Sequence, residues 1–161
     1  MSENKEFKCC PEFTPEIWNE KFHKWKNKRF VKDKVLTFFY IPLNFGSVMT
    51  RLFNKIKKSN VDTPEYLCLS DHTSKWSMDI YVAVDGNVEK AENVVISGDF
   101  LSKVYDGPYG DTAKWMKDFE NYAKGKNVKI KKIYMWYVYC PNCAKEYGHN
   151  YCTVIAEVLP A

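Results

Sequence analysis

The sequence predicts an α+β fold built from two β-α-β-β units, which form one mixed sheet with two helices on one face. Strand-like and helix-like segments follow one another in the same order twice, over 35–85 and over 94–158. A proline precedes the amphipathic helix of each unit, at Pro42 and at Pro108. Each unit ends in two strand-like segments joined by a loop. Because both helices cover the same face, we expect a ligand cleft between the repeats on the opposite face.

The first unit starts with a strand over 35–41, which is rich in β-branched and aromatic residues. Apolar residues then recur at helical spacing over 48–58, which predicts an amphipathic helix with one face in a core. Residues 66–71 and 78–84 are the two strands of the hairpin.

The second unit repeats this order. Residues 94–105 are predicted as a long strand, in which Gly98 marks a β-bulge. A helix follows over 111–125, with an aspartate at its start and a glycine at its end. The strands of the second hairpin are predicted over 131–140 and 150–158, joined by a loop.

Residues 1–34 are predicted as an extended lead-in with one short helix near 15–20. The chain of 161 residues has 45% hydrophobic and 27% charged residues, which indicates a single globular domain over 1–161. The N-terminus has no apolar signal region, and no apolar run is long enough for a membrane span. We therefore expect a cytoplasmic protein without a membrane partner, and the sequence leaves its oligomeric state open.

The charge pattern does not favour a nucleic-acid partner. The net charge is +4, and the basic residues cluster over 21–34 and 124–132. Trp25 and Phe30 interleave with the first cluster, as in a surface that stacks bases and contacts phosphates. No nucleic-acid-binding motif accompanies this pattern, so a solvated basic segment is the preferred interpretation.

Four of the six cysteines are candidate zinc ligands. Cys140 and Cys143 have the two-residue spacing that lets both sulfur atoms bind one metal ion, and Cys9 and Cys10 would complete a tetrahedral set. Zinc bound there would tie the N-terminal segment to the second hairpin. Reduced thiols without a metal are the alternative. A redox pair is disfavoured, because too little chain follows Cys143 for the long helix that such motifs require.

Two carboxylates are candidates for general acid or base catalysis. Asp79 shares a strand face with Tyr81, and Glu146 lies in the last loop beside Tyr147. A carboxylate in an aromatic pocket has a raised pKa and can exchange protons with a bound water molecule. The alternative for both residues is a solvated position. The chain has no nucleophile elbow, phosphate-binding glycine loop or HExxH motif, which disfavours serine hydrolase, kinase and zincin mechanisms.

The aromatic content of 16% exceeds the needs of a small core and suggests a lined cavity or a binding face. In the strand before Cys140, alternation separates Tyr134 and Trp136 from Tyr137 and Tyr139, and the sequence leaves open which set faces the helices. The candidate ligand-binding residues are Trp76, Tyr81, Tyr105, Trp136, Tyr137, Tyr139 and Tyr147.

Several motifs resemble those of a known family. Residues 97–109, Ser-Gly-Asp-Phe-Leu-Ser-Lys-Val-Tyr-Asp-Gly-Pro-Tyr, and the helix after them resemble the second repeat of GyrI-like small-molecule-binding domains, the effector-binding fold of multidrug-sensing transcription activators. Residues 69–84 resemble the loop and strand that end the first repeat. The Cys-Cys-Pro start, Phe-Val-Lys-Asp at 30–33 and Cys-Pro-Asn-Cys-Ala-Lys at 140–145 resemble stand-alone bacterial members described as hydrolases.

The resemblance implies an aromatic cleft between the repeats, with an acidic residue that meets cationic or polar aromatic ligands. It also implies hydrolysis of strained or cyclopropanoid compounds, as in some stand-alone relatives. The chain departs from the family at Val154, where many members carry a glutamate, so a pocket carboxylate must come from elsewhere. Three functions stay open: a ligand-binding domain with hydrolase activity, a non-catalytic sensor or sequestering protein, and a zinc-stabilised adaptor for protein or RNA.

Overall fold

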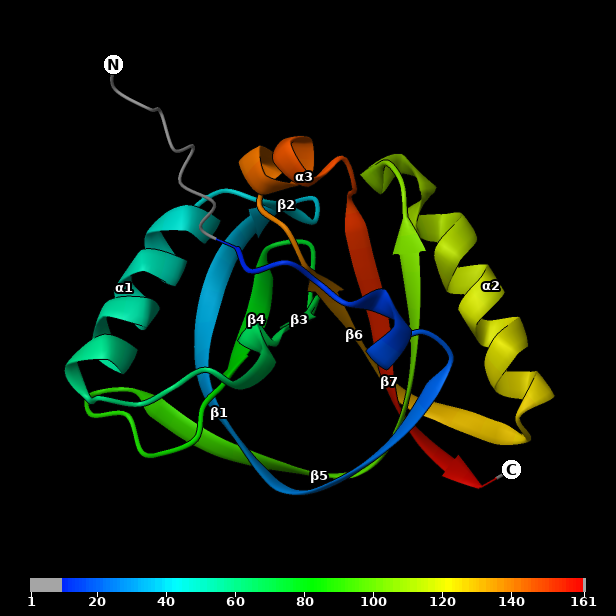
Figure 1. Ribbon diagram of the computed structural model, residues 1–161, viewed down its shortest axis with the longest axis horizontal. Helices are drawn as coiled ribbons and strands as arrows, with labels where there is room; N and C mark the ends of the chain where they lie inside the picture. Colours follow the sequence, from blue (N-terminus) through cyan, green and yellow to red (C-terminus); the bar gives the residue numbers. More distant parts are fainter. Residues whose placement is uncertain (1–9, 161) are drawn as a thin grey trace.

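The computed structural model describes residues 10–160, which form an α+β fold with one seven-stranded sheet (Figure 1). The strands are β1 (Lys21–Phe38), β2 (Ile41–Pro42), β3 (Cys68–Asp71), β4 (Ser77–Ala83), β5 (Glu92–Asp106), β6 (Val128–Tyr137) and β7 (Tyr151–Pro160). The helices are α1 (Phe45–Lys58), α2 (Thr112–Gly125) and α3 (Pro141–Tyr147), and the short 3₁₀ turns are η1 (Pro15–Ile17), η2 (Pro64–Tyr66) and η3 (Tyr109–Asp111). None of the helices in this part of the chain is both long and apolar enough to cross a membrane.

The strand order is β2-β1-β4-β3-β6-β7-β5, and β1 also pairs with β5, so the sheet closes on itself. The α+β class is confirmed, but the sheet is antiparallel at each of its pairings between described strands, where a mixed sheet was expected. The reason lies in the strand order. Within each repeat the last strand enters between the two strands that the helix connects, so the parallel strands never become neighbours.

Both predicted long helices are present and cover the outer face of the sheet at opposite sides (Figure 1). The apolar stripe of α1 packs on β1 and β4 through Val48, Leu52 and Ile56. The stripe of α2 packs on the strands of the second repeat through Trp115 and Phe119. The inner face of the sheet holds a third, more aromatic cluster, formed by Trp18, Phe30, Leu67, Leu69, Tyr81, Ala83, Phe100, Tyr134, Trp136 and Ile155.

The lead-in is shorter than predicted, because β1 begins at Lys21. Its first half pairs with β5 and closes the gap between the repeats. Lysines on the exposed side of this strand alternate with the half-buried His23 and Trp25, a period of two that is typical of a strand. The register shifts between Trp25 and Lys28, opposite Gly98 at φ 147°, so the bulge expected at Gly98 lies in its partner strand.

The loop predicted after Cys140 contains the short helix α3. The Cys140 sulfur accepts a hydrogen bond from the Cys143 backbone N–H and caps the helix start, where Pro141 occupies the first turn. Gly148 ends the helix in the left-handed conformation at φ 73°. The sequence carries both signals, Pro141 at the start and Gly148 at the end, but the prediction for this segment was a loop.

Candidate functional site

Two carboxylates lie opposite each other on the inner face of the sheet. Asp71 of β3 and Asp79 of β4 are direct cross-strand partners, and both side chains lie on the face that Tyr81 shares. Each carboxylate side chain is only 13% exposed. Like charges placed opposite each other destabilise a sheet unless other groups compensate them. Two carboxylates in this arrangement therefore require positive charge nearby.

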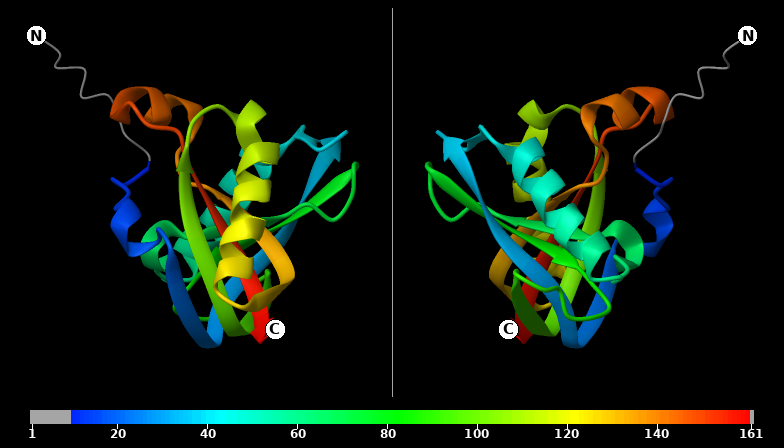
Figure 2. Two further views of the ribbon diagram at one scale, coloured as in Figure 1. Left: turned by 90° about the vertical axis from the view of Figure 1, so that its right-hand side faces the viewer. Right: turned by 90° about the vertical axis from the view of Figure 1, so that its left-hand side faces the viewer.

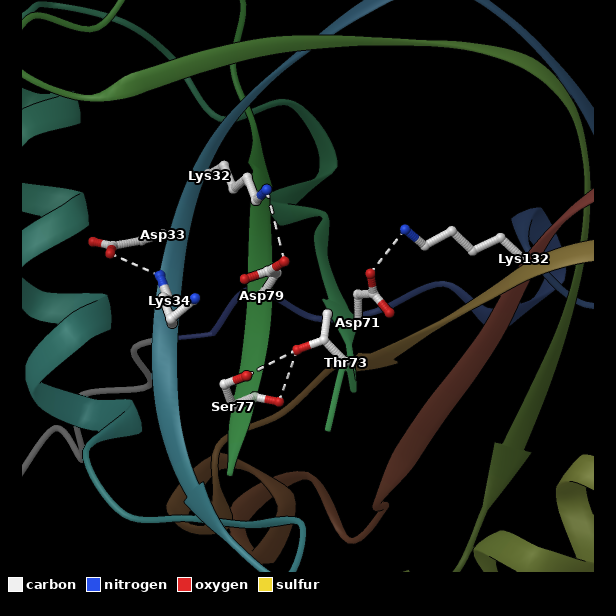
Figure 3. Close-up of polar contacts among 8 residues, drawn as sticks. All are labelled: Lys32, Asp33, Lys34, Asp71, Thr73, Ser77, Asp79 and Lys132. Atoms are coloured by element: carbon white, nitrogen blue, oxygen red, sulfur yellow. Dashed lines mark hydrogen bonds and ion pairs between the residues drawn. The ribbon is translucent and has the colours of Figure 1, made fainter. Parts of the chain in front are cut away.

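Two lysines compensate the acidic pair, which we define as Asp71 and Asp79 (Figure 3). Lys132 Nζ lies 2.8 Å from Asp71 Oδ2, and the hydrogen bond to this carboxylate raises the pKa of Lys132. Lys32 Nζ lies 3.7 Å from Asp79 Oδ2, which is a looser contact. The same lysines lie over aromatic rings, Lys32 at 5.7 Å from the centroid of Tyr81 and Lys132 at 5.3 Å from that of Tyr134. The site therefore presents charge of both signs beside tyrosine rings.

A surface hollow of about 690 Å³ reaches Asp79 and Lys32 from the side of α1. It lies beyond the start of β5, where one edge of β1 has no strand partner. Its other walls are formed by Asp33, Lys34, Arg51, Leu52, Lys55, Lys90, Ala91 and Glu92. The looser of the two ion pairs is thus accessible from outside the sheet.

The apolar half of the inner face is covered by residues 10–18, which we call the N-terminal segment. Trp18 and Phe13 pack edge-on against Trp136, with ring centroids 5.1 and 5.3 Å apart. The backbone N–H of Phe13 donates a hydrogen bond to the Tyr139 hydroxyl at 2.8 Å. Trp136 is therefore only 3% exposed, and the face on which the ligand cleft was predicted is filled here by the chain itself.

A second polar and aromatic group lies on the outer face. It is formed by His72, Tyr109 and Tyr137, and we call it the repeat junction. His72 Nε2 and the Tyr137 hydroxyl are 3.0 Å apart, and Tyr137 also meets Tyr109 edge-on at 5.6 Å. The buried Nδ1 of His72 has no hydrogen-bond partner within the described part of the chain. Burial lowers the pKa of His72, so its ring is neutral at neutral pH.

The remaining predicted aromatic residues are separated from these sites. Tyr105 stacks on Trp115 at 5.7 Å and donates a hydrogen bond to Asp118 at 2.7 Å, so it is tied to α2. Trp76 is 55% exposed at the tip of the first hairpin, where it contacts Phe38 and Phe39. Figure 2 shows this tip and the end of β1 (cyan) on the side of the sheet opposite the N-terminal segment (blue).

The two catalytic candidates occupy different surroundings. Asp79 lies on the inner face, as described, whereas Glu146 is exposed on α3. Its neighbour Tyr147 stacks on Tyr139 at 4.5 Å. Sequence reasoning missed Asp71 as the partner of Asp79. The predicted strand ranges, 66–71 and 78–84, do not fix the register that makes the two residues partners.

Three of the four cysteines predicted as zinc ligands lie close together. The sulfur atoms of Cys10, Cys140 and Cys143 lie within 4.8 Å of one another, and this set could hold a metal ion. The backbone N–H of Cys140 donates to Cys10 Sγ at 3.4 Å. The fourth predicted ligand, Cys9, lies outside the described residues.

Cys68 and Cys152 were not predicted as metal ligands, and burial raises the pKa of each thiol to about 12. These two cysteines are core residues with little thiolate character.

The architecture of the sheet and helices defines a class: the chain has the GyrI-like fold. The sequence also matches the family model described as "Bacterial hydrolase" over residues 1–158, and the protein belongs to this family. No curated protein matches the chain.

Four solved structures illustrate the likeness. The C-terminal domain of EcmrR is 9% identical with a TM-score of 0.61, over 90% of this chain and 99% of the domain. In the EcmrR–DNA complex the TM-score is 0.67 at 9% identity, over 89% of this chain, but the chain spans only 58% of that protein. A hydrolase from Listeria innocua is 8% identical with a TM-score of 0.62, over 88% and 92% of the two chains. SAV2435 bound to tetraphenylphosphonium is 9% identical with a TM-score of 0.51, over 88% and 94%. At these identities the likeness shows the fold alone.

Proposed function

We propose that the protein binds small amphipathic or aromatic compounds, cationic ones in particular, on the inner face at the acidic pair. The observation that carries the proposal is the cross-strand pairing of Asp71 and Asp79, each largely buried beside a tyrosine ring. The shared fold supports it, because SAV2435 was solved with the cation tetraphenylphosphonium bound.

The chemistry of binding is an exchange of cations. A ligand cation takes the place of the Lys32 ammonium group next to Asp79, because this contact of 3.7 Å is the weaker of the two ion pairs. The ring of Tyr81 then offers its face to the ligand, as it does now to Lys32. The displaced lysine side chain is long and flexible enough to move into solvent.

We further propose that the protein hydrolyses some of the compounds that it binds, and the family description "Bacterial hydrolase" supports this. In that reaction Asp79 takes a proton from a water molecule, and the resulting hydroxide forms a bond to the electrophilic carbon of a strained or ester-like substrate. The bond from this carbon to its leaving group breaks, and protonated Asp79 returns the proton to the leaving group. The Tyr81 hydroxyl orients the substrate. The exposed Glu146 is the second candidate for the carboxylate, and the non-catalytic alternative is a sensor or sequestering protein.

Tetraphenylphosphonium and an uncharged aromatic compound of similar size are the probes for binding, followed by tryptophan fluorescence. The Asp79→Asn and Asp71→Asn variants should bind the cation roughly tenfold more weakly, equivalent to about 1.4 kcal/mol, with little change for the uncharged compound. Asp118→Asn on the exposed side of α2 is the matched control. Unchanged cation affinity in both test variants would contradict the proposal.

Turnover separates the enzyme from the sensor. A panel of esters and strained cyclic compounds is incubated with the protein, and products are followed by mass spectrometry. If Asp79→Asn abolishes turnover and retains binding of the same compound, the protein is a hydrolase that uses Asp79. If instead Glu146→Gln has this effect, the catalytic carboxylate lies on α3. Binding without turnover in the unaltered protein selects the sensor.

A zinc-stabilised adaptor for protein or RNA is the second candidate function. The sulfur cluster supports the zinc part, and exposed Lys24, Lys26 and Arg29 on β1 support contact with RNA phosphates. One observation argues against a surface that stacks bases: the Trp25 ring packs on the buried Phe100, with ring centroids 4.2 Å apart. Salt-sensitive retention on immobilised RNA, lost in a Lys24→Glu, Lys26→Glu variant, would select this function.

A further inference from the structure

Three cysteine sulfur atoms from opposite ends of the chain meet beside α3. Cys10 comes from the N-terminal segment, Cys140 caps the start of α3, and Cys143 lies in its first turn. All three sulfur atoms lie within 4.8 Å of one another, and Cys143 is only 2% exposed. Neither small-molecule binding nor hydrolysis at the acidic pair uses this cluster.

We propose that Cys10, Cys140 and Cys143 bind one structural zinc ion, which fastens the N-terminal segment to α3. Thiolates around zinc at about 2.3 Å are separated by roughly 3.8 Å in a tetrahedral site, so the observed cluster needs only a small contraction. Soft sulfur ligands select zinc over magnesium or calcium, which prefer oxygen. The sequence predicts the fourth ligand at Cys9, next to Cys10.

Hydrogen bonds around the cluster suit thiolates. The backbone N–H of Cys140 donates to Cys10 Sγ at 3.4 Å, and that of Cys143 donates to Cys140 Sγ at 3.5 Å. Donors aimed at metal-bound thiolates orient them and offset part of their negative charge. A redox pair would need only Cys140 and Cys143, whereas here the third sulfur completes a set suited to a metal.

The zinc ion reinforces contacts that cover the inner face. The Tyr147 hydroxyl donates to the Cys10 carbonyl at 2.8 Å, and the Phe13 N–H donates to the Tyr139 hydroxyl at 2.8 Å. Phe13 and Trp18 then lie against Trp136. Loss of the metal would loosen this cover, and any effect on ligand access rests on the function proposed above. The metal site itself does not.

The first test is metal binding under reducing conditions, with cobalt as a spectroscopic probe. We expect one zinc ion per chain by elemental analysis, and cobalt should give sulfur-to-metal charge-transfer and tetrahedral absorption bands. Cys10→Ser, Cys140→Ser and Cys143→Ser should each weaken zinc binding at least tenfold, which is about 1.4 kcal/mol. Cys68→Ala is the matched control, because this buried thiol lies in β3 and outside the cluster.

Two results would overturn the proposal. One is the absence of zinc and cobalt binding by the reduced protein. The other is a Cys140–Cys143 disulfide in metal-free protein purified without reductant, which would indicate a redox pair. Cys9→Ser decides the fourth ligand: weakened binding supports four cysteines, and unchanged binding supports the three-cysteine site with a water molecule.

The second test measures the fastening by hydrogen exchange, without any ligand of the inner face. Chelation of zinc should speed exchange in the N-terminal segment, including the Phe13 amide, and leave α2 unchanged. Equal exchange of the N-terminal segment with and without zinc would contradict its fastening. Because no ligand is present, failure of small-molecule binding leaves this readout intact.

Discussion

The two hairpins of the molecule share one topology and differ in their connections. Thr73 and Ser77 close the short connection between β3 and β4, where the Thr73 hydroxyl donates to the Ser77 carbonyl at 3.0 Å (Figure 3). The connection between β6 and β7 carries the helix α3 and the sulfur cluster. The first repeat thus supplies the acidic pair from its strands. The second repeat supplies two of the three clustered cysteines from α3 and its start. The shared topology thus positions the strands, and the two connections differ in which candidate groups they bring together.

The helices of the two repeats also pack differently. The core under α1 is aliphatic, with Leu52 1% exposed, whereas α2 buries Phe119 completely. Phe119→Ala should lower the free energy of unfolding by about 3–5 kcal/mol and Leu52→Ala by about 2–5 kcal/mol, because each leaves a cavity. Urea unfolding followed by circular dichroism measures both.

The number of unfolding transitions shows whether the two repeats unfold together. Because β1 pairs with both β4 and β5, the repeats share a strand and should unfold together. Each variant should then shift a single transition. Two separate transitions in either variant would show that the repeats are independent units.

The end of α3 is the next place to test the difference between the repeats. Gly148 has φ 73°, a conformation that an alanine adopts only with strain, so Gly148→Ala should cost about 1 kcal/mol. Gly125 ends α2 without a positive φ and has open space around its Cα, so Gly125→Ala should be neutral or stabilise by about 0.5 kcal/mol.

Thermal unfolding of both glycine variants, with and without added zinc, measures these effects. A strained α3 would also misplace Cys140 and Cys143, so the cost of Gly148→Ala should grow when zinc is present. Equal stability of the two variants would show that the αL cap does not fix α3.

The repeated order of elements was predictable because hydrophobic periodicity within each segment is a local signal. Both long helices and the strands of both hairpins lie close to their predicted ranges. The start of β1 was missed because its lysines and aromatics read as a charged lead-in, and only pairing with β5 makes them a strand. Sheet direction was missed for a related reason, since strand order is a property of the whole chain.

The candidate site was predictable only in part. Alternation in a strand groups Asp79 with Tyr81 and Tyr134 with Trp136, but it leaves open which face of the sheet each group takes. The structure places both groups on the inner face. The lysine partners Lys32 and Lys132 come from other strands, and no local pattern links them to the aspartates. The spacing of Cys140 and Cys143 predicted that both sulfur atoms can bind one metal ion, with reduced thiols as the alternative. The position of Cys10 beside this pair comes from the structure, because no local pattern links the two ends of the chain.

The smallest expected effect concerns two histidines that link the repeats. His23 Nε2 lies 2.7 Å from the Ser102 hydroxyl of β5, and His72 Nε2 lies 3.0 Å from the Tyr137 hydroxyl of β6. Burial lowers the pKa of both rings below the ordinary value of 6.5, and nearby Lys28 adds to this for His23. The folded protein therefore binds fewer protons than the unfolded chain in this range.

The contribution of the neutral His23 and His72 rings to the free energy of unfolding is therefore complete above pH 6.5. It declines as the pH falls below 6.5 towards the pKa values of the folded protein. Urea unfolding at a series of pH values measures the slope of the free energy of unfolding against pH. This slope should become shallower in the His72→Gln variant and shallower still when His23→Gln is added. His149→Gln is the control, since this histidine is 49% exposed and pairs with Asp106. A slope unchanged by His72→Gln would show that the ring of His72 accepts a proton without cost, although its Nδ1 is buried.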